Sequence, residues 1–374
     1  MKPGRPKILV YGLGSLGDNI ISVPALRSVR AHFGAEANIC LLHDLQDSNR
    51  VTAEAVLGPT GLVDRFISYQ FHNSISRKIF TALRLWVQLW RLRFAVVVSL
   101  LPSQRSAKSL ARDVFFFRLC GIRRHVGFSA IPEAELQPRD SRGARLRTRQ
   151  ESRLRLSRLE RSGIALAESE SYRQPLVEVP QSERLAVDRW LTAWRRKPER
   201  TLVAICPGCK QPANAWHLSN FLEIGRRLIA AREFELIVVG GPAERGAAEQ
   251  LTKSWGEGLM AAGEFSVMGS AAILQRCQFM IGLDTGTSHL AAGVGTACVV
   301  VQGARTVPGM WDPLGPGHTV IRKQVNCEAC HEFKCPKPDH PCMSMITVDE
   351  VWSAVETLRL NKHHTFSVLD HAGA

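Results

Sequence analysis

The chain has 374 residues, enough for two domains of ordinary size, and 45% of them are hydrophobic. Lysine and arginine outnumber aspartate and glutamate by 48 to 34, so the formal net charge is +14. These values fit a globular protein with substantial cores and exclude a strongly acidic chain. The charge favours anionic partners, which include nucleotides, nucleic acid and anionic membrane surfaces, and it does not choose among them.

The first residues predict a strand rather than a signal peptide, because glycines and an acid interrupt the apolar run of residues 8–18. We therefore expect a cytoplasmic protein. Its ten cysteines are then expected to be reduced thiols or metal ligands rather than a disulfide framework.

The first half alternates short apolar runs with helical patterns. Strands are predicted at residues 7–12, 37–44, 63–70, 94–101 and 123–128. Helices are predicted at residues 18–33, with Pro24 near the start, and at 109–121. The run 94–101 is continuously apolar, as in a strand buried on both faces of a parallel sheet. This alternation predicts a doubly wound α/β domain, with residues 63–70 as an edge strand.

The most apolar stretch, residues 79–101, is interrupted by Arg84, Arg91 and Arg93, each costly at the centre of a bilayer. It predicts a helix to about Arg93 and then the strand of residues 94–101. One face of that helix carries Leu83, Trp86, Val87 and Trp90. We expect this face to pack on the sheet of its own domain, with docking on a membrane surface as the alternative.

The alternation of apolar runs and helical patterns is lost between residues 130 and 185, where residues 139–161 are rich in arginine and are expected to be solvated. The alternation resumes after residue 185. Strands are predicted at residues 201–208, 234–242, 278–284 and 297–303, and helices at 218–231, 244–255, 270–277, 288–295 and 348–360. We expect two α/β domains, residues 1–185 and 186–360, followed by a flexible tail at 361–374.

Gly12, Gly14 and Gly17 spell the G-x-G-x-x-G pattern of dinucleotide-binding loops between a strand and a helix. Asp18 follows directly, where its carboxylate would repel a phosphate. The acid that should bind the ribose is expected about 20 residues on, whereas Asp44, which ends the second strand, lies 27 residues past Gly17. The hypothesis of an NAD(P)-dependent oxidoreductase therefore rests on these glycines and on little else.

The stretch GSLGDNIISVPALRSVR, residues 14–30, resembles the N-terminal signature of glycosyltransferase family 9, the lipopolysaccharide heptosyltransferases. Matching pieces follow in order, and the resemblance runs from about residue 7 to 358. They are CPGCKQPANAWHLSNFLEIGRRL, VVGGPAERGAAEQL, CQFMIGLDTGTSHLAAGVGTACVVVQG and CEACHEFKCPKPDHPCMSMI. The resemblance implies a GT-B fold, with two Rossmann-like doubly wound domains facing across a cleft. It also implies an inverting, metal-independent transfer from a nucleotide sugar.

The resemblance makes Asp18 the candidate general base, which takes the proton of the acceptor hydroxyl as it attacks the anomeric carbon. In that role Gly14 and Gly17 form the glycine-rich turn that aims Asp18. The alternative is that Asp18 merely caps a helix. The N-terminal domain would bind the acceptor, and the arginine-rich segment 139–161 can face it.

The candidate donor site lies in the C-terminal domain. Thr285 and Gly286 stand where a strand runs into a helix, which offers amides and a hydroxyl to a diphosphate. Asp284 suits sugar hydroxyls, and His289 either contacts the donor or packs. Glu244 follows a strand, where it can accept from the ribose hydroxyls or serve the helix dipole.

One position departs from the family pattern. Many members carry a lysine two residues before the tryptophan that follows Pro-Gly, and this chain has Asn214 there. Lys210 lies four residues earlier and is the candidate replacement cation.

Cys327, Cys330, Cys335 and Cys342 lie at short spacing in a proline-rich segment. Four thiolates can close a structural zinc or iron site, and free or redox-active thiols are the alternative. No cofactor is expected for catalysis.

The leading hypothesis is an inverting transferase that moves a heptose or a related sugar, with ADP-heptose as the expected donor. The expected acceptor is a lipopolysaccharide core or another lipid-linked acidic glycan, reached from the inner face of the cytoplasmic membrane. The alternatives are the NAD(P)-dependent oxidoreductase and a non-catalytic binding relative, the latter motivated by Asn214 and the charge. Nucleic acid is not an expected partner, because no RNA-binding motif with interleaved aromatic residues is visible.

Overall fold

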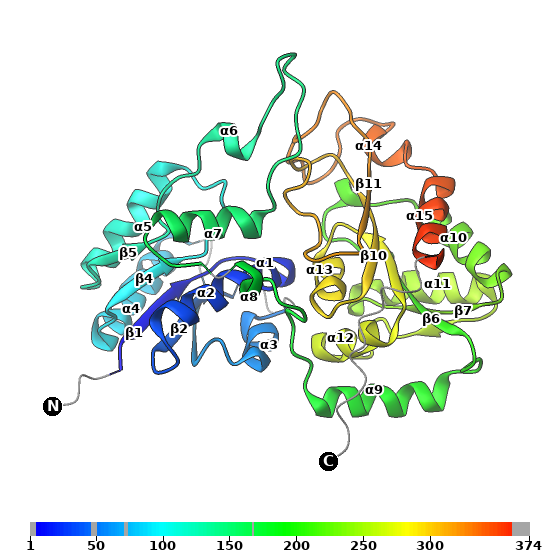
Figure 1. Cartoon of the computed structure of the whole chain (residues 1–374), viewed down its shortest axis with the longest axis horizontal. Helices are drawn as coiled ribbons and strands as arrows, with labels where there is room; N and C mark the ends of the chain where they lie inside the picture. Colours follow the sequence, from blue (N-terminus) through cyan, green and yellow to red (C-terminus); the bar gives the residue numbers. More distant parts are fainter. Residues whose placement is uncertain (1–4, 46–50, 71–73, 167, 361–374) are drawn as a thin grey trace. The chain divides into compact units, whose positions relative to one another are not determined.

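The structure, a computed structural model, describes residues 5–45, 51–70, 74–166 and 168–360. The predicted tail, residues 361–374, lies outside the described residues. Two compact units divide the chain (Figure 1). Unit 1 is Met1–Glu178 with Val307–Trp311, and unit 2 is Val179–Thr306 with Asp312–Ala374. Each unit is built on a parallel sheet with flanking helices, as the alternation of apolar runs predicts.

In unit 1 the strands run in the order β3-β2-β1-β4-β5, all parallel. Their bounds are β1 Lys7–Tyr11, β2 Asn38–Asp44, β3 Arg65–Tyr69, β4 Val96–Ser99 and β5 Arg124–Val126. The central strand β1 pairs Ile8 with Ile39 on one side and with Val96 on the other. All five predicted strands of this half are confirmed, and β3 is the predicted edge strand.

The helices of unit 1 are α1 Leu16–Ile21, α2 Val23–Phe33, α3 Ala53–Leu57, α4 Ile75–Leu92, α5 Ala107–Leu119, α6 Glu133–Leu136, α7 Glu151–Arg161 and α8 Glu168–Ser171, with the 3₁₀ turn η1 Gly58–Thr60. The helix predicted from residue 18 to 33 is split at Ser22, and a first helix begins at Leu16. Pro24 lies in the first turn of α2, where its missing N–H costs no hydrogen bond.

The predicted packing face of α4 is wrong. Leu83, Trp86, Val87 and Trp90 are exposed. The helix instead buries Leu85 and Leu89 in the core of unit 1, where they pack with Leu9 and Phe94. The buried side of α4 is thus a narrow stripe, and most of its apolar surface faces outward. No helix among the described residues is long and apolar enough to cross a bilayer.

The expectation that residues 139–161 are solvated is wrong for its second half. That half forms α7, in which Arg155 and Arg158 are fully buried together with Leu154 and Leu159. The start of α7 is held by a distant segment of the chain. Met310 O accepts a hydrogen bond from Glu151 N at 2.8 Å, and Pro308 O accepts one from Thr148 N at 2.8 Å.

In unit 2 the strands run in the order β11-β10-β9-β6-β7-β8, again all parallel. Their bounds are β6 Thr201–Cys206, β7 Phe234–Val238, β8 Leu259–Met260, β9 Phe279–Leu283, β10 Ala297–Gln302 and β11 Thr319–Arg322. Ile205, Val238, Ile281 and Val299 place these strands in one core. The sequence did not predict β8, which has two residues, or β11, which is half-buried along its length.

The helices of unit 2 are α9 Gln181–Trp194, α10 Leu218–Ala230, α11 Arg245–Trp255, α12 Val267–Arg276, α13 Gly286–Gly293, α14 Pro341–Ser344 and α15 Val348–Leu360, with the 3₁₀ turns η2 Pro212–Asn214 and η3 Pro242–Glu244. The sequence did not predict α9, which packs on α12 and pairs Asp188 with Arg276 at 2.8 Å. In both sheets the carboxyl ends of the strands are where ligands of open α/β sheets bind.

Candidate active site

Asp18 lies in the first turn of α1, just after β1. The backbone of Gly14 has a φ of +133°, a conformation that favours glycine. A Cβ atom at Gly14 would lie 2.3 Å from Cγ of Asp18, so the turn leaves room for this carboxyl group only without a side chain. Gly17 is buried inside α1. Gly14 is therefore the glycine that the position of Asp18 requires.

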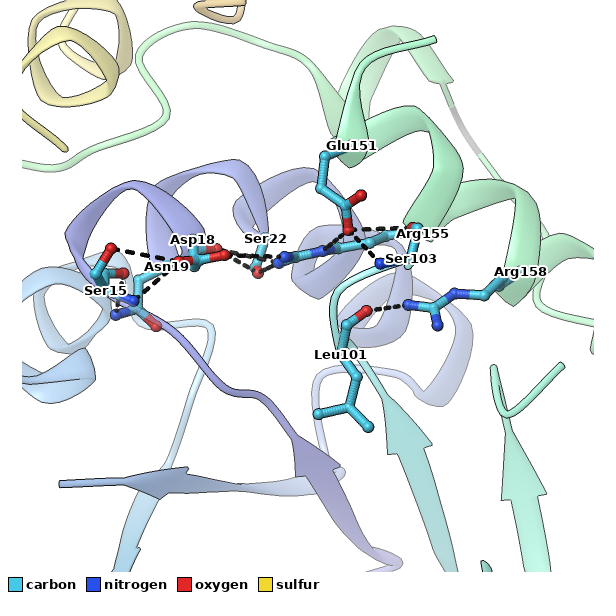
Figure 2. Close-up of polar contacts among 9 residues, drawn as sticks. All are labelled: Ser15, Asp18, Asn19, Ser22, Leu101, Ser103, Glu151, Arg155 and Arg158. Carbon is cyan, nitrogen blue, oxygen red and sulfur yellow. Dashed lines mark hydrogen bonds and ion pairs between the residues drawn. The ribbon is translucent and has the colours of Figure 1, made fainter. Parts of the chain in front are cut away.

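The carboxylate of Asp18 is held from two sides (Figure 2). Its Oδ2 accepts a hydrogen bond from Ser15 N at 2.9 Å and one from Ser15 Oγ at 3.3 Å. Its Oδ1 lies 3.3 Å from Nη2 of Arg155. Asp18 thus caps α1, the alternative role that the sequence offered, while its side chain stays 18% exposed. The carboxylate of Asp18 is therefore fixed in orientation and still accessible to solvent.

Arg155 is itself fixed by a buried acid. Its Nε donates to Oε1 of Glu151 at 2.9 Å, and both side chains are shielded from solvent. The same Oε1 accepts from Ser103 N at 2.8 Å and from Ser103 Oγ at 3.1 Å. The Nη1 atom of Arg155 donates to Ser22 Oγ and to Asp18 O. A fully buried guanidinium is costly unless it is paired in this way.

Arg158, one turn after Arg155, is also fully buried and donates to Leu101 O. Burial lowers the pKa of its guanidinium to about 10, which Arg155 reinforces and Glu151 opposes. Glu151, Arg155 and Arg158 were not predicted as site residues from the sequence. The available signal was the set of leucines within this run, which marks a buried helix face.

Glu244 lies at the carboxyl end of β7, in η3. Its Oε2 accepts a hydrogen bond from Gly241 N at 2.7 Å. A Cβ atom at Gly208, in the loop after β6, would lie 2.2 Å from Cγ of Glu244, and one at Gly240 would lie 2.7 Å from its Cβ. The two glycines let this half-buried carboxylate lie across the ends of two neighbouring strands.

Asp284 follows β9 directly and is half-buried. Burial raises the pKa of its carboxyl group to about 6, against the opposing charge of Arg305, while Asp312 raises it further. The side chain of Gln302, at the end of β10, lowers the pKa of Asp284 and so opposes the effect of burial. At neutral pH this carboxylate is therefore mostly ionised, although burial makes its charged form less favourable in free energy. A ligand that donates hydrogen bonds to it would offset that unfavourable free energy.

Thr285 and Gly286 begin α13, whose first-turn amides have no partner within the helix. Ser288 Oγ closes the turn by donating to Thr285 O at 2.7 Å. His289, one turn in, is buried, with 4% of its surface exposed. The structure thus brings Asp284, Thr285 and Gly286 together at one strand end, and His289 N donates a hydrogen bond to Thr285 O at 3.4 Å.

Asn214 lies beside this strand end. It is buried, and its Nδ2 donates to Asp284 O at 3.3 Å. Its Oδ1 accepts no hydrogen bond from any described group of the chain. A Cβ atom at Gly303 would lie 3.1 Å from this Oδ1. Lys210, the candidate replacement cation, is exposed in the loop after β6.

The metal site suggested for Cys327, Cys330, Cys335 and Cys342 is not supported. All ten cysteines lie within the described ranges and are free thiols. No group of three or more His, Cys, Asp or Glu side chains within those ranges is placed to hold a metal ion. Burial raises the pKa of the Cys342 thiol, and the charges of Cys335, Cys327 and Cys330 reinforce this shift.

Comparisons with known proteins fit this arrangement. A family model described as glycosyltransferase family 9 (heptosyltransferase) matches residues 159–340. Lipopolysaccharide heptosyltransferase 2 of Escherichia coli K12 is 22% identical over 172 residues, 44% of this chain and 48% of that protein. Its namesake from Salmonella typhimurium is 25% identical over 168 residues, 43% of this chain and 47% of that protein. The chain thus spans about half the length of these curated relatives.

Solved structures give a wider match. A glycosyl transferase family 9 structure from Veillonella parvula has a TM-score of 0.73 at 19% identity, covering 97% of this chain and 99% of that chain. The E. coli ADP-heptose lps heptosyltransferase II has a TM-score of 0.68 at 19% identity, covering 96% and 99%. At these identities the likeness shows the fold alone. The predicted α/β class with GT-B-type parallel sheets is confirmed.

Proposed function

We propose that this chain is a member of glycosyltransferase family 9 and that it transfers a heptose from ADP-heptose, with inversion, to a lipopolysaccharide core or another lipid-linked acidic glycan. The observation that carries the chemistry is the partly exposed carboxylate of Asp18, oriented by Ser15 and by the buried Arg155. The donor and acceptor classes are inferred from the relatives, a lipopolysaccharide heptosyltransferase and an ADP-heptose lps heptosyltransferase.

We assign the proton transfer to Asp18. The acceptor oxygen attacks the anomeric carbon, the bond from that carbon to the diphosphate oxygen breaks, and the hydroxyl proton passes to the Asp18 carboxylate. The nucleoside diphosphate leaves with the bonding electrons. A positioned base of this kind contributes roughly 10²–10⁴-fold to the rate. Neither bond change requires a metal or a redox cofactor.

We assign donor binding to unit 2. Thr285, Gly286 and the first amides of α13 would receive the diphosphate, while Asp284 would accept from sugar hydroxyls. Glu244 would accept from the ribose hydroxyls, His289 would contact the donor, and Lys210 would supply the cation that Asn214 does not. Developing charge on the leaving diphosphate needs such a cation, because electrostatic stabilisation is often the largest catalytic term.

We also propose a cytoplasmic protein that works at the inner face of the cytoplasmic membrane. A lipid-linked acceptor is presented there, and the net charge of +14 suits an anionic surface. The nicotinamide alternative loses support, because the Asp18 carboxyl group occupies the space beside Gly14 where a pyrophosphate would approach.

The test is transfer by the purified chain. It is incubated with ADP-heptose and a delipidated lipopolysaccharide core, and the product is read by mass spectrometry. Thermal shifts with ADP, GDP, UDP, CDP and NAD⁺ are measured in parallel, where a ligand at a hundred times its Kd adds about 2.7 kcal/mol of stability. We expect a heptosylated product and a shift with ADP. A shift with NAD⁺ alone would overturn the proposal, and nucleotide binding without transfer from any donor would indicate the non-catalytic relative.

A further inference from the structure

The outward side of α4 is apolar along its whole length. Seven side chains on it are exposed, from Ile75 at 75% and Phe80 at 67% to Val87 at 36%. They are Ile75, Ile79, Phe80, Leu83, Trp86, Val87 and Trp90. Only Leu85 and Leu89 of this helix, all of whose residues are described, are buried. Such spacing places the exposed residues on the side of the helix opposite the core.

This apolar surface continues onto the end of α5, which lies beside α4 (Figure 1). Trp86 Nε1 donates a hydrogen bond to Leu119 O at 2.8 Å. Phe115 and Leu119 are themselves 63% and 55% exposed. We call these nine side chains, seven on α4 and two on α5, the apolar patch. Soluble proteins rarely expose contiguous apolar surface on this scale without a partner for it.

A row of cations borders the patch. Arg77, Arg84 and Arg91 follow one another at seven-residue intervals, so they lie along one side of α4, and all three are exposed. The sequence of α4 contains no aspartate or glutamate. Arg118 adds an exposed cation beside Leu119 on α5. We call these four residues the basic rim.

Two hollows open along the same border. One, of about 660 Å³, lies between β3 and α4 and is lined by Tyr69, Arg77, Phe80 and Arg84 among others. The other, of about 410 Å³, is lined by Arg65, Arg84 and Arg91 with Val87. Each hollow combines guanidinium groups with apolar side chains, which is the chemistry that receives a phosphate joined to an acyl chain.

We propose that the apolar patch and the basic rim dock this protein on an anionic phospholipid bilayer. The helix α4 lies in the plane of the interface, with its apolar side chains in the acyl region and Trp86 and Trp90 at the depth of the headgroups. The arginines of the rim contact lipid phosphates. A second copy of the chain fits less well, because self-association through this surface would bring the two basic rims near each other.

The apolar patch and the basic rim would be the surface for the membrane association proposed above, whichever sugar is transferred. Its test is flotation of the full chain with vesicles of phosphatidylcholine that contain about 30 mol% phosphatidylglycerol or none. We expect binding to the anionic vesicles and little to the neutral ones. We also expect binding to weaken as salt screens the arginines. Equal binding to both vesicles would overturn the role of the basic rim.

Two double variants locate the surface. Ile79→Ser with Leu83→Ser, and Arg84→Glu with Arg91→Glu, should each lower vesicle binding by about tenfold or more. Leu185→Ser on α9 and Arg226→Glu on α10 are matched controls on exposed positions of unit 2. All changed side chains are exposed, so melting temperatures should stay close to that of the parent chain. If both double variants bind the anionic vesicles as well as the parent chain does, the proposal is overturned.

Two further measurements separate this inference from its competitors. Light scattering without lipid should give the same mass for the parent chain and the Ile79→Ser, Leu83→Ser variant. A dimer that this variant converts to a monomer would assign the patch to a second copy and overturn the proposal. With a delipidated acceptor, both double variants should keep the turnover of the parent chain. Vesicle binding is scored without substrate, so a chain that floats but transfers no sugar would refute only the proposed function.

Discussion

The guanidinium of Arg155 meets the carboxylate of Asp18 at 3.3 Å, although 137 residues separate the two in the chain. Arg155 is fully buried and bound to Glu151, so it is the fixed member of the pair. Asp18 is the member that solvent can reach, and the one that would meet the acceptor in the proposed reaction. A carboxylate anchored in this manner loses little freedom when an acceptor binds, which is the advantage of a preorganised base.

Asp18→Asn should abolish transfer while leaving donor binding intact. The amide keeps the size of the side chain and cannot take up a proton from the acceptor hydroxyl, so kcat should fall roughly 10²–10⁴-fold. Turnover is measured with ADP-heptose, and donor binding by the thermal shift with ADP. Asp349→Asn, at an exposed position of unit 2, is the control. Turnover near that of the parent would remove Asp18 from the chemistry.

Arg155 acts on the reaction through Asp18, so its loss should lower kcat with little change in the KM for the donor. Arg155→Met also leaves the buried carboxylate of Glu151 without its ion-pair partner. This change should lower the free energy of unfolding by about 3–5 kcal/mol. Combining it with Glu151→Gln should restore much of the stability but not the turnover. Arg155→Lys should rescue only in part, because one ammonium cannot repeat the forked contacts to Glu151 and Asp18. A double variant with normal kcat would show that Arg155 is only structural.

Asp284→Asn should stabilise the protein at alkaline pH and not at acidic pH. The pKa of Asp284 is raised from 3.8 to about 6 by burial, so the folded state binds this proton more tightly than the unfolded state. Its contribution is therefore favourable below about pH 4 and is lost as pH rises through 6. At about pH 8 the variant should gain at most about 3 kcal/mol. Melting curves at about pH 4 and pH 8 test this, and equal shifts at both would contradict it.

Lys210→Ala should weaken donor binding if this lysine replaces the missing cation at Asn214. The KM for ADP-heptose should rise several-fold, because a diphosphate loses a favourable charge. Adding Asn214→Lys to the same chain should recover part of the loss. Lys253→Ala, in the last turn of α11, is the matched control. An unchanged KM in Lys210→Ala would leave Lys210 without a role at the donor site.

Gly208→Ala should disturb recognition of the ribose. The new Cβ atom would lie 2.2 Å from Cγ of Glu244, so this carboxylate must move away from the strand ends. We expect the preference for ADP over 2′-deoxy-ADP to shrink, as measured by calorimetry. Gly246→Ala on α11 meets nothing within 4 Å and should leave the preference unchanged. If both variants keep it, Glu244 does not bind the ribose.

The strands were predictable because their cores read as continuous apolar runs. β4 and β9 are buried at every residue. A short continuous apolar run is typical of a strand of a parallel sheet that is covered on both faces. The two-residue strand β8 offers no such run. Amphipathicity predicted α4 as a helix, but not which of its sides faces the core, because periodicity alone does not distinguish a sheet from a membrane as the apolar partner.

The candidate site was predictable only where its residues stand in local motifs. Asp18 and Glu244 each follow a strand and a glycine-bearing turn, and Asp284 follows a strand directly, so their place at the carboxyl ends of strands was expected. Arg155 and Glu151 were missed because arginine-rich segments are usually solvated. Their role depends on a contact with α1 that no local pattern records.

Unit 1 can be completed only after its segment Val307–Trp311 has been translated. The carbonyl groups of this segment bond Thr148 N and Glu151 N at the start of α7, yet the segment leaves the ribosome only after most of the unit 2 sheet has been translated. A nascent chain that ends before residue 307 therefore holds the sheet of unit 1 but lacks two bonds that anchor the helix carrying Arg155. Domains usually fold in the order of their translation. The anchoring bonds of α7 can therefore form only after the C-terminal half of the message has been translated.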